Sequence, residues 1–239
     1  TQQIEDKLKE LYPGVRTLRM DADTTRAKDS YEKILSAFSN GEADVLIGTQ
    51  MIVKGHDFPK VTLVGILAAD LSLNASDYRA GERTFQLLTQ AVGRAGRGAL
   101  PGEAVIQTYQ PDHYAITCAA AQDYKSFYEE EILYRELSGY PPAAHMLAVQ
   151  IYGKEEENVK QLARRLTDVV KSNMDFLQIL GPTPANISKI NDIYRYVFYA
   201  KHAEYDTLVA VKDCVEETLR QWQPRQLSIQ FDFDPVNVL

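Results

Sequence analysis

Two arginines set among glycines are the residues of this sequence best suited to chemistry. Arg94 and Arg97 stand three residues apart in Gly93-Arg94-Ala95-Gly96-Arg97, shortly after Gln90. The planar guanidinium binds phosphate oxygens bidentately and can neutralise charge that develops on a transferring phosphoryl group. Glycine costs a helix about 1 kcal/mol, so a pair of them suits a place where backbone must approach a partner closely. The pattern predicts two guanidiniums on one helical face that reach a single phosphate-rich anion.

No phosphate-cradling loop accompanies these arginines. The form Gly-x-x-x-x-Gly-Lys-Ser/Thr is absent, and the only Gly-Lys pair, Gly153-Lys154, lacks both the upstream glycine and the hydroxyl. An Asp-Glu-x-His metal-binding box is also absent. We therefore expect that this chain alone hydrolyses no ATP.

The first hundred residues alternate short apolar runs with segments of helical spacing. Uninterrupted apolar runs such as 45–47 and 61–69 are typical of strands in a parallel sheet covered on both faces. The alternation predicts an α/β fold with helices on both faces of a parallel sheet. We expect strands at 15–20, 44–48, 61–69 and 104–109, and helices at 29–38 and 82–95.

The pattern changes after Pro111. Residues 112–137 contain neither Gly nor Pro and predict one long helix, which Gly139-Tyr140-Pro141-Pro142 ends sharply. The remainder has the order β-α-β-β-α-β, which predicts a small α+β domain of the ferredoxin-like, split βαβ type. We therefore expect three parts, at 1–111, 112–142 as a helical connector, and 143–239.

Composition limits the class of protein. The net charge of −7 argues against a surface that is basic throughout, although a local basic groove remains open. Cys118 and Cys214 lack clustered histidines, so we expect reduced thiols and no metal site. No apolar run is long enough to span a membrane, and no signal-peptide pattern is present. We expect a cytoplasmic protein, and the missing initiator Met suggests an excised or processed piece.

Two motifs together resemble a known family. Gln90-x-x-Gly93-Arg94-x-Gly96-Arg97 looks like motif VI of superfamily 2 helicases, and 48–59 resembles their motif V. Across nearly the whole chain the sequence resembles the bacterial replication-restart helicases, also called primosomal helicases. That resemblance implies that 1–111 is a RecA-like second helicase lobe. The segments that extend it are 19–25, 77–83, 181–185, 194–196 and 232–235.

The resemblance implies roles around ATP. Arg94 and Arg97 would contact the γ-phosphate across a cleft between two lobes, one of them as an arginine finger. Gln90 would orient water or phosphate nearby. Gly55 and Asp57 would approach the nucleotide, with Asp57 near the ribose. The implied cofactor is ATP with Mg²⁺ in the full-length protein.

The resemblance also implies contacts with DNA. Thr49, Gln50 and Lys54 would touch the backbone of the tracked strand, and the hydroxyls of Thr24 and Thr25 are further candidates. The run 189–202 interleaves basic and aromatic residues, which suits a single-strand or branch-binding surface. The alternative is a β-hairpin with packed aromatics, which we favour for Val197 and Phe198. DNA contact is expected for Lys189, Tyr194 and Arg195.

The family's partners follow from the same resemblance. They are single-stranded and forked DNA, primosome proteins and single-strand-binding proteins, with no membrane partner. Zinc is expected in the full-length protein, within a cysteine-rich insertion whose cysteines this chain lacks. The implied task is 3′-to-5′ DNA unwinding that restarts replication at stalled or branched forks. The alternatives are a non-catalytic docking module for forks or proteins, and a different superfamily 2 helicase that processes branches or RNA.

Several charged and histidine residues have simpler interpretations. Asp77, Arg79, Glu82 and Arg83 either form a solvated charged face or couple ATP to DNA. The run Glu129-Glu130-Glu131 is expected to be a solvated helix face. His56 lies in motif V but is expected to be structural or exposed, and the three remaining histidines are expected to be structural: His113, His145 and His202.

Overall fold

The protein is described here by a computed structural model that covers residues 1–27, 29–53, 58–98, 100–174, 176–222 and 226–236. The chain forms two compact units. The lobe unit comprises Thr1–Asn74 and Gly81–Phe127, and the C-terminal unit comprises Ala75–Ala80 and Tyr128–Leu239. The short segment Ala75–Ala80, which we call the strap, therefore belongs to the unit that follows it much later in sequence. Within the described ranges, no helix combines the length and apolar character needed to cross a membrane.

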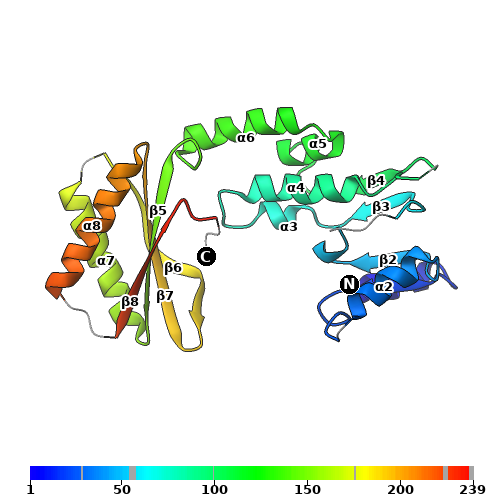
Figure 1. The fold of residues 1–239 in the computed structure, drawn as a ribbon, viewed down its shortest axis with the longest axis horizontal. Helices are drawn as coiled ribbons and strands as arrows, with labels where there is room; N and C mark the ends of the chain where they lie inside the picture. Colours follow the sequence, from blue (N-terminus) through cyan, green and yellow to red (C-terminus); the bar gives the residue numbers. More distant parts are fainter. Residues whose placement is uncertain (28, 54–57, 99, 175, 223–225, 237–239) are drawn as a thin grey trace. The chain divides into compact units, whose positions relative to one another are not determined.

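The lobe unit is built from parallel strand pairs and helices, which confirms the α/β expectation (Figure 1). β1 pairs with β2, and β3 pairs with β4, so the described strands form two two-stranded ladders. The elements up to the end of β4 are α1 (Gln2–Leu11), β1 (Thr17–Met20), α2 (Ser30–Ser39), β2 (Val45–Gly48), the 3₁₀ turn η1 (Gln50–Val53), β3 (Leu63–Ile66), α3 (Asp70–Leu73), α4 (Ala80–Val92) and β4 (Glu103–Ile106).

Two small cores hold the lobe unit together. Met20, Leu35 and Phe58 are buried in one of them. In the other, Phe85 of α4 stacks on Phe127 with ring centroids 4.1 Å apart. Aromatic pairs of this geometry add about 0.5–1.5 kcal/mol beyond the area they bury.

The expectation of a single long helix at 112–137 was wrong, because the structure has two helices there. These are α5 (Tyr114–Ala121) and α6 (Tyr124–Ser138). Gln122 takes a left-handed conformation with φ of 55°, which ends α5. The carboxylate of Asp123 then accepts hydrogen bonds from the amide and the hydroxyl of Ser126. An N-terminal cap of this kind restarts the helix in a new direction.

The C-terminal unit has the ferredoxin-like topology that the sequence predicted. Its four strands lie in the order β6-β7-β5-β8, and each adjacent pair is antiparallel. Each βαβ crossover is split by a strand inserted between its two strands. α7 and α8 cover one face of the sheet (Figure 1). The elements are β5 (His145–Gly153), α7 (Glu156–Asn173), β6 (Gln178–Ile190), β7 (Ile193–His202), α8 (Tyr205–Trp222) and β8 (Leu227–Phe233).

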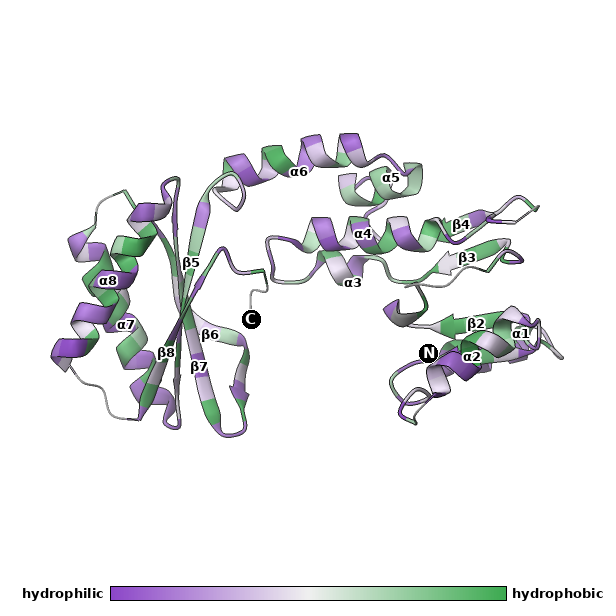
Figure 2. Cartoon of the chain, viewed as in Figure 1, coloured by the Kyte–Doolittle hydropathy of each residue, from purple (hydrophilic) through white to green (hydrophobic). Residues whose placement is uncertain are grey.

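The core of this unit lies between the sheet and the two helices. Apolar side chains of α7 recur at helical spacing, and alternate residues of the strands face them (Figure 2). Phe198 of β7 is fully buried there, and Val197 is buried on the opposite face. The packed-hairpin interpretation is therefore confirmed for both residues. Fully buried members include Leu147, Val149, Ile151, Val159, Leu166, Phe198, Leu208 and Val211.

Candidate nucleotide and nucleic-acid sites

The two candidate arginines lie on a turn, not on a helical face. α4 ends at Val92, and the amides of Gly93 and Arg94 donate to carbonyls four and three residues earlier, respectively. The turn that follows ends at Gly96, which takes a left-handed φ of 71° and whose amide donates to the carbonyl of Val61. The expectation of one shared helical face was wrong. The turn nevertheless keeps Arg94 and Arg97 within one short loop.

The glycines of this turn serve the chain's own packing. A Cβ at Gly96 would lie 2.7 Å from the amide nitrogen of Gly102, and a Cβ at Gly98 would lie 2.0 Å from the carbonyl oxygen of Pro59. Real Cβ atoms do not approach so closely, so the backbones can meet only without side chains. The sequence predicted close backbone approach to a bound partner, whereas here two segments of the same unit approach each other.

The side chains of this turn differ in their environments. Arg97 is exposed, and its Nε donates to the carbonyl of Gly93 at 2.6 Å. This bond anchors the base of the guanidinium and restricts its rotation. Arg94 is half-buried, and Gln90 is exposed on the last turn of α4. The chain thus brings the three residues into one stretch at the end of α4.

The candidate DNA contacts of the lobe unit share one strand edge. Met20 is paired in parallel with Gly48, so the residues that follow β1 and β2 leave the same edge. Thr49 and Gln50 are exposed there. Ligands of open α/β sheets bind outside the carboxyl ends of the strands. Lys54, Gly55, His56 and Asp57 lie outside the described residues.

Asp21 organises the turn that holds Thr24 and Thr25. Its carboxylate accepts a hydrogen bond from the Thr1 hydroxyl and others from the amides of Asp23 and Thr24. The hydrogen bond from Thr1, followed by that from the Thr24 amide, lowers the pKa of Asp21 to about 2. The hydroxyl of Thr25 donates to the carbonyl of Asp21 at 2.7 Å. A phosphate oxygen would have to replace that intrachain hydrogen bond.

The candidate residues of the C-terminal unit divide between two faces of the hairpin formed by β6 and β7. Lys189 is paired across the hairpin with Tyr194, and its ammonium lies 4.8 Å from the Tyr194 ring centroid. Tyr194 also packs against the core on the helix side. Arg195 follows Tyr194 on the strand, so it points to the other face and lies over Tyr152. The structure therefore brings Lys189 and Tyr194 together and separates Arg195 from them.

Lys189 already has a carboxylate partner. Its ammonium lies 2.9 Å from Asp192, whose side chain is 92% exposed. Hydrogen bonding to Asp192 and the nearby Tyr194 raise the pKa of Lys189. Exposed pairs of this kind are weak, because water screens both charges, so a phosphate can exchange with Asp192 at little cost.

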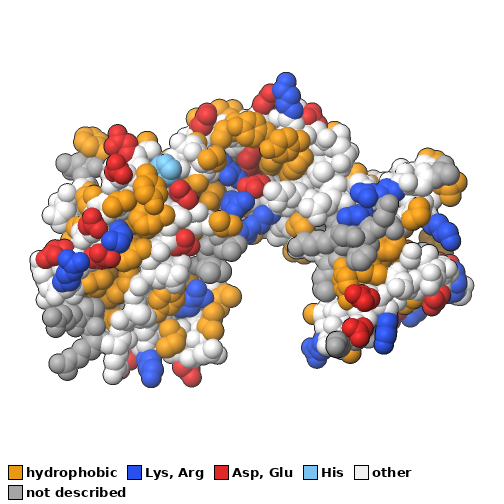
Figure 3. Space-filling view, viewed as in Figure 1, with side chains coloured by type: hydrophobic (Ala, Val, Ile, Leu, Met, Phe, Trp, Pro, Cys, Tyr) orange, Lys and Arg blue, Asp and Glu red, His pale blue; other side chains and the backbone are white. Residues whose placement is uncertain are grey.

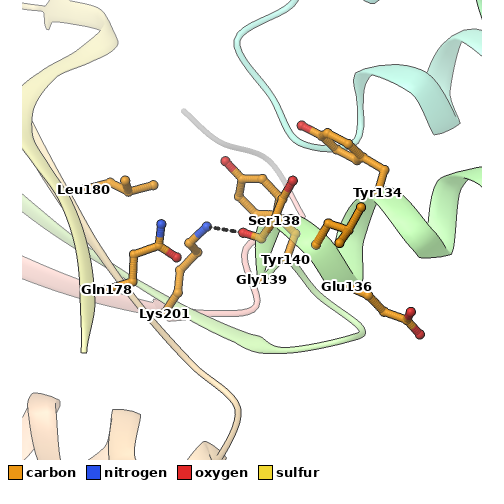
Figure 4. Close-up of a pocket in the computed structure, with 9 residues that line it drawn as sticks. Tyr134, Glu136, Ser138, Gly139, Tyr140, Gln178, Leu180 and Lys201 are labelled. Atoms are coloured by element: carbon orange, nitrogen blue, oxygen red, sulfur yellow. Dashed lines mark hydrogen bonds between the residues drawn. The ribbon is translucent and has the colours of Figure 1, made fainter. Parts of the chain in front are cut away.

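A pocket of about 520 Å³ lies in the C-terminal unit (Figure 4). Lys201 is almost fully buried at its wall, and its ammonium donates to the carbonyl of Ser138 at 2.7 Å. The same ammonium lies 3.9 Å from the ring centroid of Tyr140. Burial lowers the pKa of Lys201. Large exposed hydrophobic side chains gather on the neighbouring helix α6, among them Leu137 at 80% exposure (Figure 3).

The expectation that Glu131 lies on a solvated helix face was wrong. Glu131 is buried, and its carboxylate binds the buried Arg135 at 2.6 and 2.8 Å. Arg135 also donates to the carbonyl of Pro141 at 2.9 Å. Glu129 and Glu130 are exposed, as expected for a solvated face.

The histidines of the described ranges have structural partners, as expected. His113 accepts a hydrogen bond from the amide of Ala115 and caps α5. His202 likewise accepts one from the amide of Glu204, and His145 lies 2.8 Å from the carboxylate of Asp234. The described residues contain no group of three or more His, Cys, Asp or Glu side chains that could hold a metal ion.

Sequence reasoning missed the cluster around Tyr78. The Tyr78 ring stacks on Tyr140 at 5.1 Å with an interplanar angle of 9°, and the guanidinium of Arg135 lies 5.5 Å from its centroid. The only signal in the sequence was the match of 77–83 to the helicase family. That match gave no indication of where the side chains would dock.

The class of protein follows from two domain matches. Residues 1–99 match the helicase conserved C-terminal domain, and residues 136–236 match the primosomal protein N C-terminal domain. The lobe unit is thus similar to a helicase C-terminal domain, and the ferredoxin-like unit is similar to the C-terminal domain of a primosomal protein.

Curated relatives narrow this class to one family. The chain is 42% identical to the replication restart protein PriA of Bacillus subtilis over 98% of its own length. It is 37% identical to that of Synechocystis over 100% of its length, and 45% identical to that of Chlamydia pneumoniae over 85%. The chain belongs to the replication restart protein PriA family. It spans 29%, 28% and 27% of the length of these three relatives, respectively.

Proposed function

We propose that this chain supplies the second motor lobe and the C-terminal domain of an ATP-dependent 3′-to-5′ DNA helicase. The helicase would recognise stalled or branched replication forks in the cytoplasm and reload the primosome there. The observation that carries the proposal is the position of Gln90, Arg94 and Arg97 in one stretch at the end of α4. A phosphate-binding lobe outside this chain would complete the ATP site.

The arginines would act on ATP held with Mg²⁺ by that other lobe. The bound nucleotide supplies the phosphoryl group that is transferred to water. Arg97 is exposed and anchored at its Nε by the Gly93 carbonyl, which suits a guanidinium that must reach outward. Arg94 is half-buried on the same turn and would hold a second phosphate oxygen. Gln90 would orient the attacking water.

The edge formed by the ends of β1 and β2 would contact the tracked strand. Thr49 and Gln50 are exposed there and can donate hydrogen bonds to phosphate oxygens. Thr25 is a further contact proposed at this edge. Lys54 is proposed to touch the same DNA strand, and Gly55 and Asp57 to approach the nucleotide. Lys189 with Tyr194 on one face of the hairpin, and Arg195 on the other, would bind single-stranded parts of the fork.

A docking role for the C-terminal unit is the second candidate function. The pocket beside Lys201 and the exposed apolar side chains of α6 favour it, because large exposed patches mark interaction sites. Single-strand-binding and primosome proteins would be the partners. Zinc would be held elsewhere in the full-length protein.

The test is DNA-stimulated ATP hydrolysis by the full-length protein with Arg94→Ala and Arg97→Ala. An arginine that stabilises phosphoryl transfer is worth about 10³- to 10⁵-fold in kcat. Arg220→Ala is the control, because Arg220 is a 73% exposed side chain on α8. Loss of kcat with intact fork binding in both motif variants is expected, and hydrolysis at the parent rate would reject the proposal. The chain by itself should release no phosphate from ATP.

A further inference from the structure

The strap is held in the C-terminal unit by a column of rings and cations. Tyr78 lies between the guanidinium of Arg135 and the ring of Tyr140, and the ammonium of Lys201 lies against Tyr140. Arg135, Tyr140 and Lys201 all belong to the later part of the chain. Cation–ring contacts are stronger when the partners are removed from water, and Arg135 and Lys201 are both buried, so these contacts anchor the strap.

A hydrogen bond fixes the phenol end of Tyr78. Its hydroxyl donates to the carbonyl of Pro235 at 3.1 Å, across 157 positions of sequence. Pro235 follows Asp234, whose carboxylate accepts the amide of Met146 at 2.8 Å. The end of β8 is thereby tied to the start of β5, and the acceptor for Tyr78 is held in place. The segment 232–235, which resembled the helicase family without any evident role, gains one here.

The backbone around Tyr78 forms a hydrogen-bonded turn that leads into α4. The carboxylate of Asp77 accepts the amide of Arg79, and the Asp77 carbonyl accepts the amide of Ala80. Ala80 is buried and is the first residue of α4. Tyr78 is therefore joined to the start of the helix by a short hydrogen-bonded turn.

α4 carries this restraint to the candidate ATP residues. The helix runs from Ala80, in the C-terminal unit, to Val92, in the lobe unit, and Gln90 lies on its last turn directly before Arg94. Within the lobe unit, Phe85 of α4 stacks on Phe127 of α6. Within the C-terminal unit, Arg135 of the same α6 lies over Tyr78. α6 thus contacts α4 within the lobe unit and the strap within the C-terminal unit.

We propose that Tyr78 is a positioning residue that fixes the start of α4 to the C-terminal unit, so that DNA bound by that unit biases the placement of Gln90, Arg94 and Arg97. The inference rests on the proposed function for the consequence in ATP hydrolysis. The anchoring itself depends only on the contacts of Tyr78. Asp77 and Arg79 are partly buried, which does not fit a fully solvated charged face, and the proposal takes the coupling interpretation of this segment as its hypothesis.

The first test measures ATP hydrolysis by the full-length protein, with and without saturating forked DNA. Tyr78→Ala should leave the rate without DNA and the fork affinity unchanged, and should reduce stimulation by DNA about 5- to 150-fold. Tyr78→Phe keeps the stacked ring and loses only the hydrogen bond, so the loss should be about 2- to 12-fold. Tyr109→Ala, at a tyrosine that is 94% exposed, is the control. Full stimulation in Tyr78→Ala would overturn the proposal.

The second test needs no ATP hydrolysis and separates the two proposals. Deuterium uptake by the amides of residues 82–85 is compared among the parent chain, Tyr78→Phe and Tyr109→Ala. Faster exchange in Tyr78→Phe alone is expected, because the first turn of α4 opens more often without its anchor. If the parent protein shows no DNA-stimulated ATP hydrolysis, the proposed function is rejected. The deuterium uptake would still test whether Tyr78 anchors the start of α4. Identical uptake in all three proteins would overturn the anchoring role.

Discussion

Removal of the Arg135 guanidinium should destabilise the C-terminal unit far more than removal of an exposed arginine. The side chains of Arg135 and Glu131 are only 8% and 7% exposed, and they are four residues apart on α6. In Arg135→Ala the Glu131 carboxylate would remain buried without its cation. Breaking a buried pair in this way lowers the free energy of unfolding by about 3–5 kcal/mol, because the remaining charge is removed from water and has no opposite charge to compensate.

The chain offers a matched control on α8. Arg220 and Glu216 have the same spacing and order, but their side chains are 73% and 35% exposed and their closest approach is 3.9 Å. Arg220→Ala should cost about 0–1 kcal/mol, because water screens the exposed pair. The double variant Glu131→Leu with Arg135→Met should recover much of the loss, since a buried pair is often replaceable by apolar side chains.

Urea unfolding followed by circular dichroism and by the fluorescence of the single Trp222 measures these differences in the C-terminal unit. The predicted order of stability is Arg220→Ala, then the double variant, then Arg135→Ala. If Arg135→Ala were as stable as Arg220→Ala, the desolvation argument would be refuted. A double variant no more stable than the single one would refute it as well.

Four further predictions follow from packing, close approach and charge. Phe198→Ala empties a fully buried site and should lower the free energy of unfolding by about 3–5 kcal/mol in urea titrations. Gly98→Ala should cost about 1–3 kcal/mol by thermal melting, since its Cβ would meet the Pro59 carbonyl. Burial raises the pKa of Tyr199 to about 12, above the ordinary value near 10. The stabilising contribution of the neutral Tyr199 phenol should therefore be fully present below about pH 10 and lost as the pH rises toward 12. Urea unfolding midpoints measured across that pH range test this. Lys189→Ala with Arg195→Ala should weaken forked-DNA binding and flatten its salt dependence in anisotropy titrations, and unchanged binding would reject that contact.

The fold of the C-terminal unit was predictable because its signals are local. Apolar positions on α7 recur at helical spacing, and the strand runs are bounded by turn residues. The order β-α-β-β-α-β leaves few antiparallel arrangements of a four-stranded sheet with both helices on one face. The structure has the expected one.

The environment of the arginine turn was not predictable from the sequence. Gly-Arg-Ala-Gly-Arg gives the same residues whether the glycines face a ligand or another part of the chain. The contact that shows glycine packing against the chain itself joins Gly98 to Pro59. These two residues are far apart in sequence and meet only after folding. The amide of Gly96 likewise donates to the carbonyl of Val61, which is distant in sequence.

The buried Glu131 on α6 shows that a run of like charges in the sequence does not reveal which of its residues is buried. Glu131 is adjacent in sequence to two exposed glutamates, and the run alone indicates a solvated face. Arg135, four residues later, was the available signal for an ion pair on one helical side. Arg135 contacts Tyr78, which lies far upstream in the sequence, so a helical pattern alone does not reveal this neighbour.

Single-turnover ATP hydrolysis by the full-length protein on forked DNA, with Arg97→Lys beside Arg97→Ala, tests the central claim most directly. Lysine keeps the charge but loses the planar two-pronged geometry, so it should not rescue the reaction. The account predicts that both variants bind ATP and fork at near parent affinity and hydrolyse about 10³-fold more slowly or worse. Hydrolysis at the parent rate in either variant would contradict the assignment of this chain as the arginine-bearing motor lobe.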